Sequence, residues 1–282
     1  MPTQIDKAEA FGALHERAGA FVIPNPWDVG TARLLADLGF EALATTSAGF
    51  AFSLGRPDAE GAISRDEMLT HVRTIVNATD LPVSADLEGG FGDDPQTVAE
   101  TIEIAAASGL VGGSIEDATG RRADPIYPHE LALDRIRAAS EMARQLPFRF
   151  TLTARAENFL FGRPDFADTV KRLQAYQEAG ADVLYAPGLT TRDQIAALVH
   201  AVDRPVNVVM GLKGARLTVA ELADIGVKRI SVGSALARAA FGAFLRAARE
   251  VREGGTFRFA NDAVPFGEIN SMFERWMKHH RG

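Results

Sequence analysis

Acidic residues follow two short apolar segments and are candidates for holding a metal ion. Asp86 and Glu88 end one segment and lead into a glycine-rich stretch, and Glu116 ends the next segment. Residues two positions apart in a strand point to the same side. Crowded carboxylates repel each other unless a cation neutralises them, and oxygen ligands suit Mg²⁺ or Mn²⁺. We therefore predict a divalent metal site formed by Asp86, Glu88 and Glu116, against the alternative of an acidic strand end and a flexible turn. Asp117 is expected to cap a turn.

An arginine at the end of the next apolar segment could bind an anion beside that metal. Arg155 directly follows the run Phe150–Ala154. A guanidinium binds carboxylate or enolate oxygens in a fork and stabilises negative charge that develops during a reaction. We predict a catalytic and substrate-binding role for Arg155. The alternative is a structural ion pair with Glu157 or with the acidic cluster.

Small and acidic residues after an earlier apolar segment are further candidates for contacting substrate. Ser47, Ala48 and Gly49 would let backbone N–H groups approach a carboxylate or carbonyl group, and Ser47 could donate its hydroxyl. The same three residues could also form an ordinary turn. Asp58 lies on a long stretch that could cover the site and is a candidate catalytic residue. It is also a common turn residue.

Glycine-rich stretches near the C-terminal end allow a rival prediction. The segment that contains Asn207 leads into Gly211–Gly214, and a later one leads through Ser231–Ser234 into a helix. Loops at these places in barrel enzymes often bind phosphate, which would indicate an enzyme acting on a phosphorylated ligand. Tight turns need glycine in any case. The histidines are scattered along helical segments and the tail, and predict no catalytic triad.

Composition excludes several classes of site. The chain has 282 residues, no cysteine and a net charge of -7. Disulfides, thiolate metal sites and a cysteine nucleophile are therefore absent. The charge balance gives no general field for nucleic acid or for a membrane surface. With no apolar signal-peptide core or membrane-spanning run, we expect a soluble cytoplasmic protein that binds neither nucleic acid nor membranes.

The elements that must position these residues repeat along the chain. Short apolar runs alternate with longer amphipathic segments, which is typical of parallel strands covered by helices. Eight such repeats in a chain of this length favour a closed (β/α)₈ barrel over an open sheet. The barrel is predicted over residues 1–255, with an extra helix before the first strand, and a C-terminal helical arm over residues 256–282. The predicted strands are Phe21–Pro24, Ala42–Thr46, Val83–Leu87, Gly113–Glu116, Phe150–Ala154, Val183–Ala186, Val206–Val209 and Ile230–Val232.

Taken together, these motifs resemble those of the isocitrate lyase/phosphoenolpyruvate mutase superfamily. The matching pieces, in the family's order, are Pro24-Asn25-Pro26-Trp27-Asp28, Thr46-Ser47-Ala48-Gly49, Pro57-Asp58, Ala85-Asp86-Leu87-Glu88-Gly89-Gly90-Phe91-Gly92, Ser114-Ile115-Glu116-Asp117, Thr153-Ala154-Arg155 and Ser231-Val232-Gly233.

The resemblance implies a barrel enzyme that binds Mg²⁺ through the acidic motif, largely through water. It implies that Ser47, the backbone beside it and Arg155 hold a 2-oxo acid. It places Asp58 near the metal and Asn207 in the pocket. It further implies a homo-oligomer, a dimer or tetramer, whose subunits exchange a C-terminal helix.

Two departures from the resemblance bear on the reaction. The isocitrate and methylisocitrate lyases are similar to one another in a cysteine-containing loop, but the corresponding loop here reads Ala118-Thr119-Gly120-Arg121-Arg122. Those lyases also carry a glutamate where this chain reads Tyr185-Ala186-Pro187-Gly188.

Three activities therefore stay open. The leading one is a Mg²⁺-dependent lyase that cleaves C–C bonds through a pyruvate-like enolate, as in decarboxylation of an oxaloacetate-like acid. Asp58, Tyr185 and Arg121 or Arg122 are candidate acids or bases for cleavage of a substituted malate. The second activity is P–C chemistry of the mutase or phosphonopyruvate hydrolase type, and the third is non-catalytic binding of a 2-oxo acid.

Overall fold

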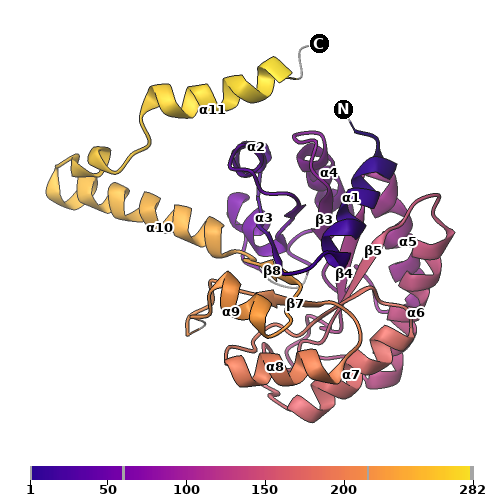
Figure 1. Cartoon of the computed structure of the whole chain (residues 1–282). Coiled ribbons are helices and arrows are strands. Elements are labelled where there is room, and N and C mark those ends of the chain that lie inside the picture. The colour runs from indigo at the N-terminus through magenta and orange to yellow at the C-terminus, as the bar shows by residue number, and fades with distance from the viewer. Residues whose placement is uncertain (1, 59–60, 215, 280–282) are drawn as a thin grey trace.

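The computed structural model, which describes residues 2–58, 61–214 and 216–279, is an α/β barrel of eight parallel strands (Figure 1). This confirms the predicted fold class. Most of the strands begin or end within one or two residues of the predicted positions. They are β1 Phe21–Ile23, β2 Leu43–Ala44, β3 Val83–Asp86, β4 Gly112–Glu116, β5 Thr151–Arg155, β6 Val183–Tyr185, β7 Val206–Val209 and β8 Arg229–Ser231.

The barrel closes at a seam between its first two strands. The strands pair in the order β1-β8-β7-β6-β5-β4-β3-β2, and among the described residues no strand ladder joins β1 to β2. One backbone bond spans the gap there, from Ala44 N–H to Pro24 O at 3.0 Å. Asn25 strengthens the seam. Its amide donates to Thr45 O at 2.9 Å, and its Oδ1 accepts from the N–H groups of Val232 and Gly233, both at 2.9 Å.

Helices follow the strands as the amphipathic segments predict, and several begin at a side chain that caps the first turn. Ser64 and Thr218 form capping boxes with the glutamate three residues later, which satisfies free N–H groups at the helix start. The barrel helices are α2 Val29–Asp37, α3 Ser47–Ser53, α4 Arg65–Val76, α5 Pro95–Ala107, α6 His129–Gln145, α7 Phe166–Glu178, α8 Arg192–Ala201 and α9 Val219–Asp224.

The short helix α3 differs from the sequence expectation of a loop after the second strand. Glycine and serine are weak helix formers, so the local sequence gave no helical pattern. Thr46 caps the helix by accepting from Gly49 N–H at 3.2 Å. Phe50 stacks on the ring of His71 at 3.7 Å between centroids, and this contact fixes α3 against α4. Tertiary contacts therefore form a helix that the sequence pattern does not indicate.

The N-terminal helix α1, Gln4–Glu16, covers the end of the barrel opposite the strand C-termini. A small apolar cluster joins it to the first strands and includes Phe11, Leu14, Phe21 and Ile23. His15 lies in the same region and is 5% exposed, with Nδ1 at 2.8 Å from Phe11 O. This end is therefore closed, so the open end of the barrel is the one where β3, β4 and β5 end.

The C-terminal elements leave the barrel and form an arm (Figure 1). Helix α10, Ala235–Arg249, continues through a π-helical turn, Glu250–Gly254, and a 3₁₀ turn, Arg258–Asn261, into α11, Phe266–His279. Helix α11 lies within residues 256–282, for which the sequence predicts a helical arm. Only the inner side of α11 touches the barrel, where Arg275 pairs with Asp37 at 2.6 Å and Arg33 lies over the Trp276 ring at 3.5 Å.

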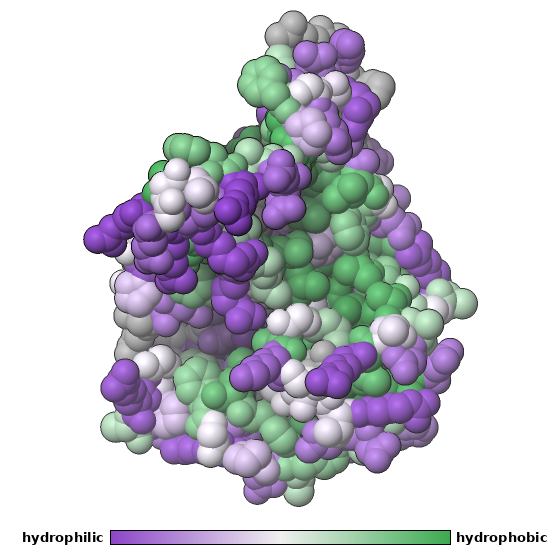
Figure 2. Space-filling model, turned by 90° about the vertical axis from the view of Figure 1, so that its left-hand side faces the viewer, coloured by the Kyte–Doolittle hydropathy of each residue, from purple (hydrophilic) through white to green (hydrophobic). Residues whose placement is uncertain are grey.

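The arm carries a large apolar surface (Figure 2). Phe244 is 68% exposed and Phe266 is 82% exposed, far more than a packed core residue. Among the described residues, no helix has the length and the apolar character needed to cross a membrane. The structure describes one chain, so the exchange of this arm between subunits stays a prediction.

Candidate active site

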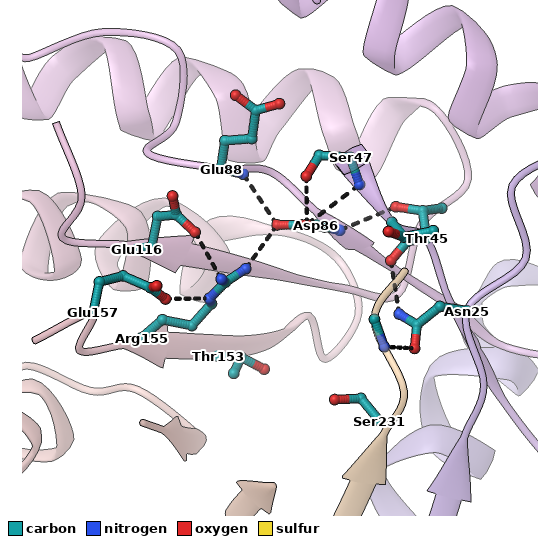
Figure 3. Close-up of polar contacts among 12 residues, drawn as sticks. Asn25, Thr45, Ser47, Asp86, Glu88, Glu116, Thr153, Arg155, Glu157 and Ser231 are labelled. Atoms are coloured by element: carbon teal, nitrogen blue, oxygen red, sulfur yellow. Dashed lines mark hydrogen bonds and ion pairs between the residues drawn. The ribbon is translucent and has the colours of Figure 1, made fainter. Parts of the chain in front are cut away.

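Arg155 stands at the centre of a cluster of carboxylates at the open end of the barrel (Figure 3). The register of the sheet explains this convergence, because Glu116 on β4 pairs directly with Arg155 on β5. Arg155 Nη1 is 2.9 Å from Asp86 Oδ1, its Nη2 is 2.9 Å from Glu116 Oε2, and its Nε is 2.8 Å from Glu157 Oε1. Three of the five N–H donors of the guanidinium are thus engaged, and two remain for a ligand.

Asp86 connects this cluster to the segment after β2. Ser47 donates to Asp86 Oδ2 through its hydroxyl at 2.9 Å and through its backbone N–H at 3.3 Å. The backbone N–H of Asp86 donates to Thr45 Oγ1 at 3.0 Å. Asp86 therefore lies between Ser47 and Arg155, and its carboxylate orientation is fixed from both sides.

The cluster holds more negative charge than one arginine can balance. Burial, with Asp86 and Asp58 nearby, raises the pKa of Glu88 to about 8. Burial raises the pKa of Glu157 to about 7 despite the opposing effect of Arg155, and burial also raises the pKa of Glu116. The pKa of Asp58 is raised by burial and by Asp86. A cation placed among these groups would lower all four values.

Glu88 is held in a backbone conformation that residues with side chains rarely adopt. Its φ is +49°, in the left-handed region. Arg135, which is 1% exposed, holds the loop that follows by donating to the carbonyl oxygens of Gly89 and Gly92. In Figure 3 the Glu88 carboxylate points away from Arg155. Strain of this kind persists where surrounding contacts fix it, and it often occurs at functional sites.

Two connected cavities open around these residues. The outer one has a volume of about 1040 Å³, and the inner one, about 200 Å³, extends into the barrel. Both are lined by Ser47, Asp58, Asp86 and Arg155. The outer cavity adds Glu88, Glu116, Glu157 and Arg122. The inner cavity adds Ala48, Tyr185, Asn207, Arg229 and Ser231.

The donor set fits a hydrated divalent cation. Within residues 2–58, 61–214 and 216–279, no group of three or more histidine, aspartate or glutamate side chains that could hold a metal ion is found. Arg155 lies between Asp86 and Glu116 and bonds to one oxygen of each. Mg²⁺ commonly keeps several waters and takes only one or two carboxylates from the protein. Asp86, Glu88, Glu116 and Asp58 line one cavity and could supply such ligands, directly or through water.

Some predicted site residues have other partners in the structure. Gly49 N–H donates to Thr46, and Gly49 does not line either cavity. Asn207 is 2% exposed, and its amide bonds to Ser231 and Arg229. Val232 and Gly233 N–H donate to Asn25, so these two N–H groups are already used within the protein and do not support the rival phosphate prediction.

Asp117 has a structural role, as we expected from the sequence. It has more hydrogen-bond partners than a residue that only caps a turn. It is 3% exposed and accepts from Glu157 N–H at 2.8 Å, from Tyr176 OH at 2.8 Å and from Arg172 at 3.1 Å. These contacts fix the backbone of Glu157, which in turn positions Arg155.

Sequence reasoning missed the supporting residues Asn25, Arg135 and Arg229 as parts of the site. Arg135 lies in the middle of the α6 pattern, and Arg229 follows a lysine at the start of a strand, so neither pattern indicates burial. Asn25 could have been found, since it lies between two prolines directly after an apolar run.

The geometry agrees with comparisons to known proteins. A family model for phosphoenolpyruvate phosphomutase matches residues 11–252. Oxaloacetate decarboxylase of Chromohalobacter salexigens is 30% identical, over 89% of this chain and 88% of the relative. A crystal structure from Burkholderia cenocepacia J2315, whose activity is named no more closely than lyase/mutase, shares 65% identity over 96% of both chains, with a TM-score of 0.93.

A third comparison concerns a metal complex. Phosphonopyruvate hydrolase bound to oxalate and Mg²⁺ is 25% identical, over 99% of this chain and 97% of that one, with a TM-score of 0.85. These findings confirm the family resemblance inferred from the motifs. The chain belongs to the phosphoenolpyruvate phosphomutase family, a group of enzymes within the isocitrate lyase/phosphoenolpyruvate mutase superfamily.

Proposed function

We propose that this enzyme is a Mg²⁺-dependent lyase that decarboxylates or cleaves a small 2-oxo acid through a pyruvate-like enolate. The observation that carries the proposal is the position of Arg155 between Asp86 and Glu116, beside Ser47, in one cavity. Decarboxylation of an oxaloacetate-like acid makes the fewest demands on the site. It needs a group that accepts electrons, but no base to start the cleavage.

The side chains of this site have separable roles in such a reaction. The two N–H donors of Arg155 that remain free suit the paired oxygens of a 2-oxo carboxylate. Ser47 donates its hydroxyl and its backbone N–H to Asp86, and so holds this carboxylate in the cavity. Mg²⁺, held by Asp86 with Glu88, Glu116 and Asp58 through water, would supply a Lewis acid for the 2-oxo oxygen. The Arg155 side chain is only 14% exposed, and this burial strengthens its attraction for the negative charge that develops on the enolate.

A substrate panel tests the proposal directly. The enzyme is incubated with oxaloacetate, substituted malates and phosphonopyruvate, each with Mg²⁺ and with excess EDTA. We expect loss of oxaloacetate that depends on Mg²⁺, with pyruvate as product. The Asp86→Ala variant should lose this activity and keep the fold, as judged by circular dichroism. Undiminished activity in that variant would contradict the metal assignment, and binding without turnover across the panel would favour a non-catalytic binding protein.

A second candidate function is P–C bond chemistry. Arg122 lines the outer cavity and could pair with a phosphonate, whereas Arg121 is bound to Asp93 at 3.0 Å. The test is ³¹P NMR of phosphonopyruvate or phosphoenolpyruvate with enzyme and Mg²⁺. A new phosphorus resonance would support this candidate, and an unchanged spectrum would remove it.

The arm supports a further part of the proposal, that the enzyme is a homo-oligomer. Exposed apolar surface of this extent is typical of an interface between proteins. Leu236, Phe244, Phe257, Val264 and Phe266 contribute to it. A second copy of the chain is the partner that the superfamily resemblance implies, and exchange of α11 between copies would cover this surface.

A further inference from the structure

The inner cavity has an unusually polar wall on the side of β6, β7 and β8. Barrel interiors are generally filled with branched apolar side chains. Here Tyr185, Asn207 and Arg229 occupy directly paired positions on these three neighbouring strands. Arg155 pairs with Tyr185 on the other side, so the row continues into the carboxylate cluster.

The hydrogen bonds in this row run in one direction. Arg229 is 5% exposed, and a guanidinium can only donate. Its Nε donates to Asn207 Oδ1 at 2.9 Å, which fixes the orientation of the amide. Asn207 Nδ2 must therefore face the other way, and it donates to Ser231 Oγ at 3.0 Å. Ser231 accepts this bond, so its own hydrogen is left for another acceptor.

The row ends at the hydroxyl of Tyr185. Ser231 and Tyr185 both line the inner cavity, and the interaction with Ser231 favours the phenolate form of Tyr185. Because Ser231 accepts from Asn207, its hydroxyl can donate to the phenol oxygen, which leaves the phenol proton for a different acceptor. In the described part of the chain no protein acceptor is bonded to that proton, and the side chain lines the inner cavity.

The surroundings of Tyr185 suit a group that gives up a proton and recovers it. Burial raises the pKa of its hydroxyl, so the group carries its proton at neutral pH. The phenolate left after transfer would lie beside two positive charges. Arg155 lies 5.1 Å from the centre of the ring, and Arg229 interacts with the same side chain. Burial lowers the pKa of Arg229 to about 10, which still leaves it charged at neutral pH.

We infer that Tyr185 is the catalytic acid that protonates C3 of the enolate, and that Arg229, Asn207 and Ser231 are positioning residues that aim its proton into the cavity. The inference rests on the proposed function. In oxaloacetate the C3–C4 bond breaks, CO₂ leaves, and the electron pair forms the enolate. That pair then returns to C3, which takes the proton from the Tyr185 oxygen. Solvent reprotonates the phenolate after the product leaves.

The Tyr185→Phe variant tests this role, because it keeps the ring beside Arg155 and removes only the hydroxyl. Two readouts are compared in the full-length enzyme with Mg²⁺. One is oxaloacetate loss. The other is exchange of the C3 hydrogens of 2-oxobutyrate in D₂O, followed by ¹H NMR. This is the reverse of the proposed step and uses the small fraction of enzyme in which Tyr185 is a phenolate. We expect exchange to fall roughly 10²-fold or more, because general acid–base catalysis contributes that much. Oxaloacetate loss should fall less, since a released enolate can take its proton from water.

Two further variants separate proton transfer from packing. Ser140→Ala also removes a buried hydroxyl, which donates to Gly180 O outside the cavities, and should keep the exchange rate per folded enzyme. Ser231→Ala should lower the exchange rate less than Tyr185→Phe does. It should also reduce the selectivity of exchange between the two C3 hydrogens.

The outcomes are distinguishable. Exchange at the wild-type rate in Tyr185→Phe would overturn the inference. So would equal loss of both readouts in a folded variant, because that pattern indicates a role in binding. Wild-type exchange without oxaloacetate loss would reject the proposed substrate, and Tyr185→Phe would still test the acid. Absence of both activities in the wild type would reject the function and the inference together.

Discussion

At the residue scale, the negative charge of the carboxylates around Arg155 exceeds the positive charge available to balance it. Glu88 shows this most clearly, since burial and two acidic neighbours raise its pKa to about 8 while its backbone is held at a positive φ. Without a cation, part of this cluster is protonated at neutral pH. Binding of a divalent cation therefore has to displace protons.

This excess of negative charge predicts that the site releases protons when it binds a metal ion. At pH 7 Glu88 is mostly protonated, and a bound cation favours its charged form. Mg²⁺ affinity should therefore rise as the pH rises from 6 towards 8 and level off above that value. Calorimetry at pH 7 in two buffers of different ionisation enthalpy measures the protons released. The Glu88→Gln variant should release fewer protons than the wild type. Glu130 lies on the exposed side of α6, so the Glu130→Gln variant should release as many protons as the wild type. Affinity that stays constant from pH 6 to 9 would contradict the prediction.

His15 carries a second prediction, which concerns stability. Burial, and then the charge of Arg229, lower the pKa of His15 to about 3. The unfolded chain, with a histidine pKa of about 6.5, binds more protons than the folded one between these values, so stability falls as the pH falls below about 6.5. The contribution of one such group approaches about 1.4 kcal/mol per pH unit.

Replacement of His15 should flatten that pH dependence. Urea unfolding at pH 7 and pH 5 measures it for the wild type and for His15→Gln. His200 is a matched control, because its Nδ1 lies 2.6 Å from the carbonyl oxygen four residues earlier but the side chain is exposed. His200→Gln should keep the wild-type slope. If unfolding free energy changes with pH equally in His15→Gln and in the wild type, His15 does not cause the pH dependence of stability.

At the scale of the elements, Asn25 joins three of them at the seam. It connects the end of β1 to the segment after β2 through one buried hydrogen bond, and to the loop after β8 through two partly buried ones. A buried donor or acceptor left without a partner costs about 1–3 kcal/mol. Asn25→Ala should therefore lower the free energy of unfolding by about 2–4 kcal/mol, measured by urea denaturation. Asn261→Ala, at an exposed position of the arm, should change it by less than about 0.5 kcal/mol. An equal loss of unfolding free energy in both variants would show that the hydrogen bonds of Asn25 contribute no specific stability.

The elements that sequence could predict are those with a strong local pattern. The strands and the long helices follow from apolar runs and helical spacing, and Asp86, Glu116 and Arg155 were identifiable because polar residues there end apolar runs. Helix α3 was not, since its residues have weak helical propensity and its stability comes from Phe50 against His71. The row from Tyr185 to Arg229 was also hidden, because it depends on the register between strands, which one strand's sequence does not contain.

At the scale of the whole molecule, the arm leaves apolar surface uncovered in a single chain. Association should cover Phe244 and Phe266. Light scattering after gel filtration should give a dimer or tetramer for the wild type and a smaller species for the Phe244→Glu/Phe266→Glu variant. Ile104→Glu changes a partly exposed residue of α5, away from the arm, and should leave the mass unchanged. A monomeric wild type would reject the proposed homo-oligomer.

The seam described above also has a consequence for biosynthesis. The side chain of Asn25 cannot form all of its hydrogen bonds until Gly233, 208 positions later, has been synthesised. At translation rates of about 5–20 residues per second, the growing chain spends roughly 10–40 s with β1 unpaired. All the carboxylates around Arg155 leave the ribosome during that interval. During that interval the incomplete barrel exposes an unpaired strand edge, and such edges favour aggregation and chaperone binding.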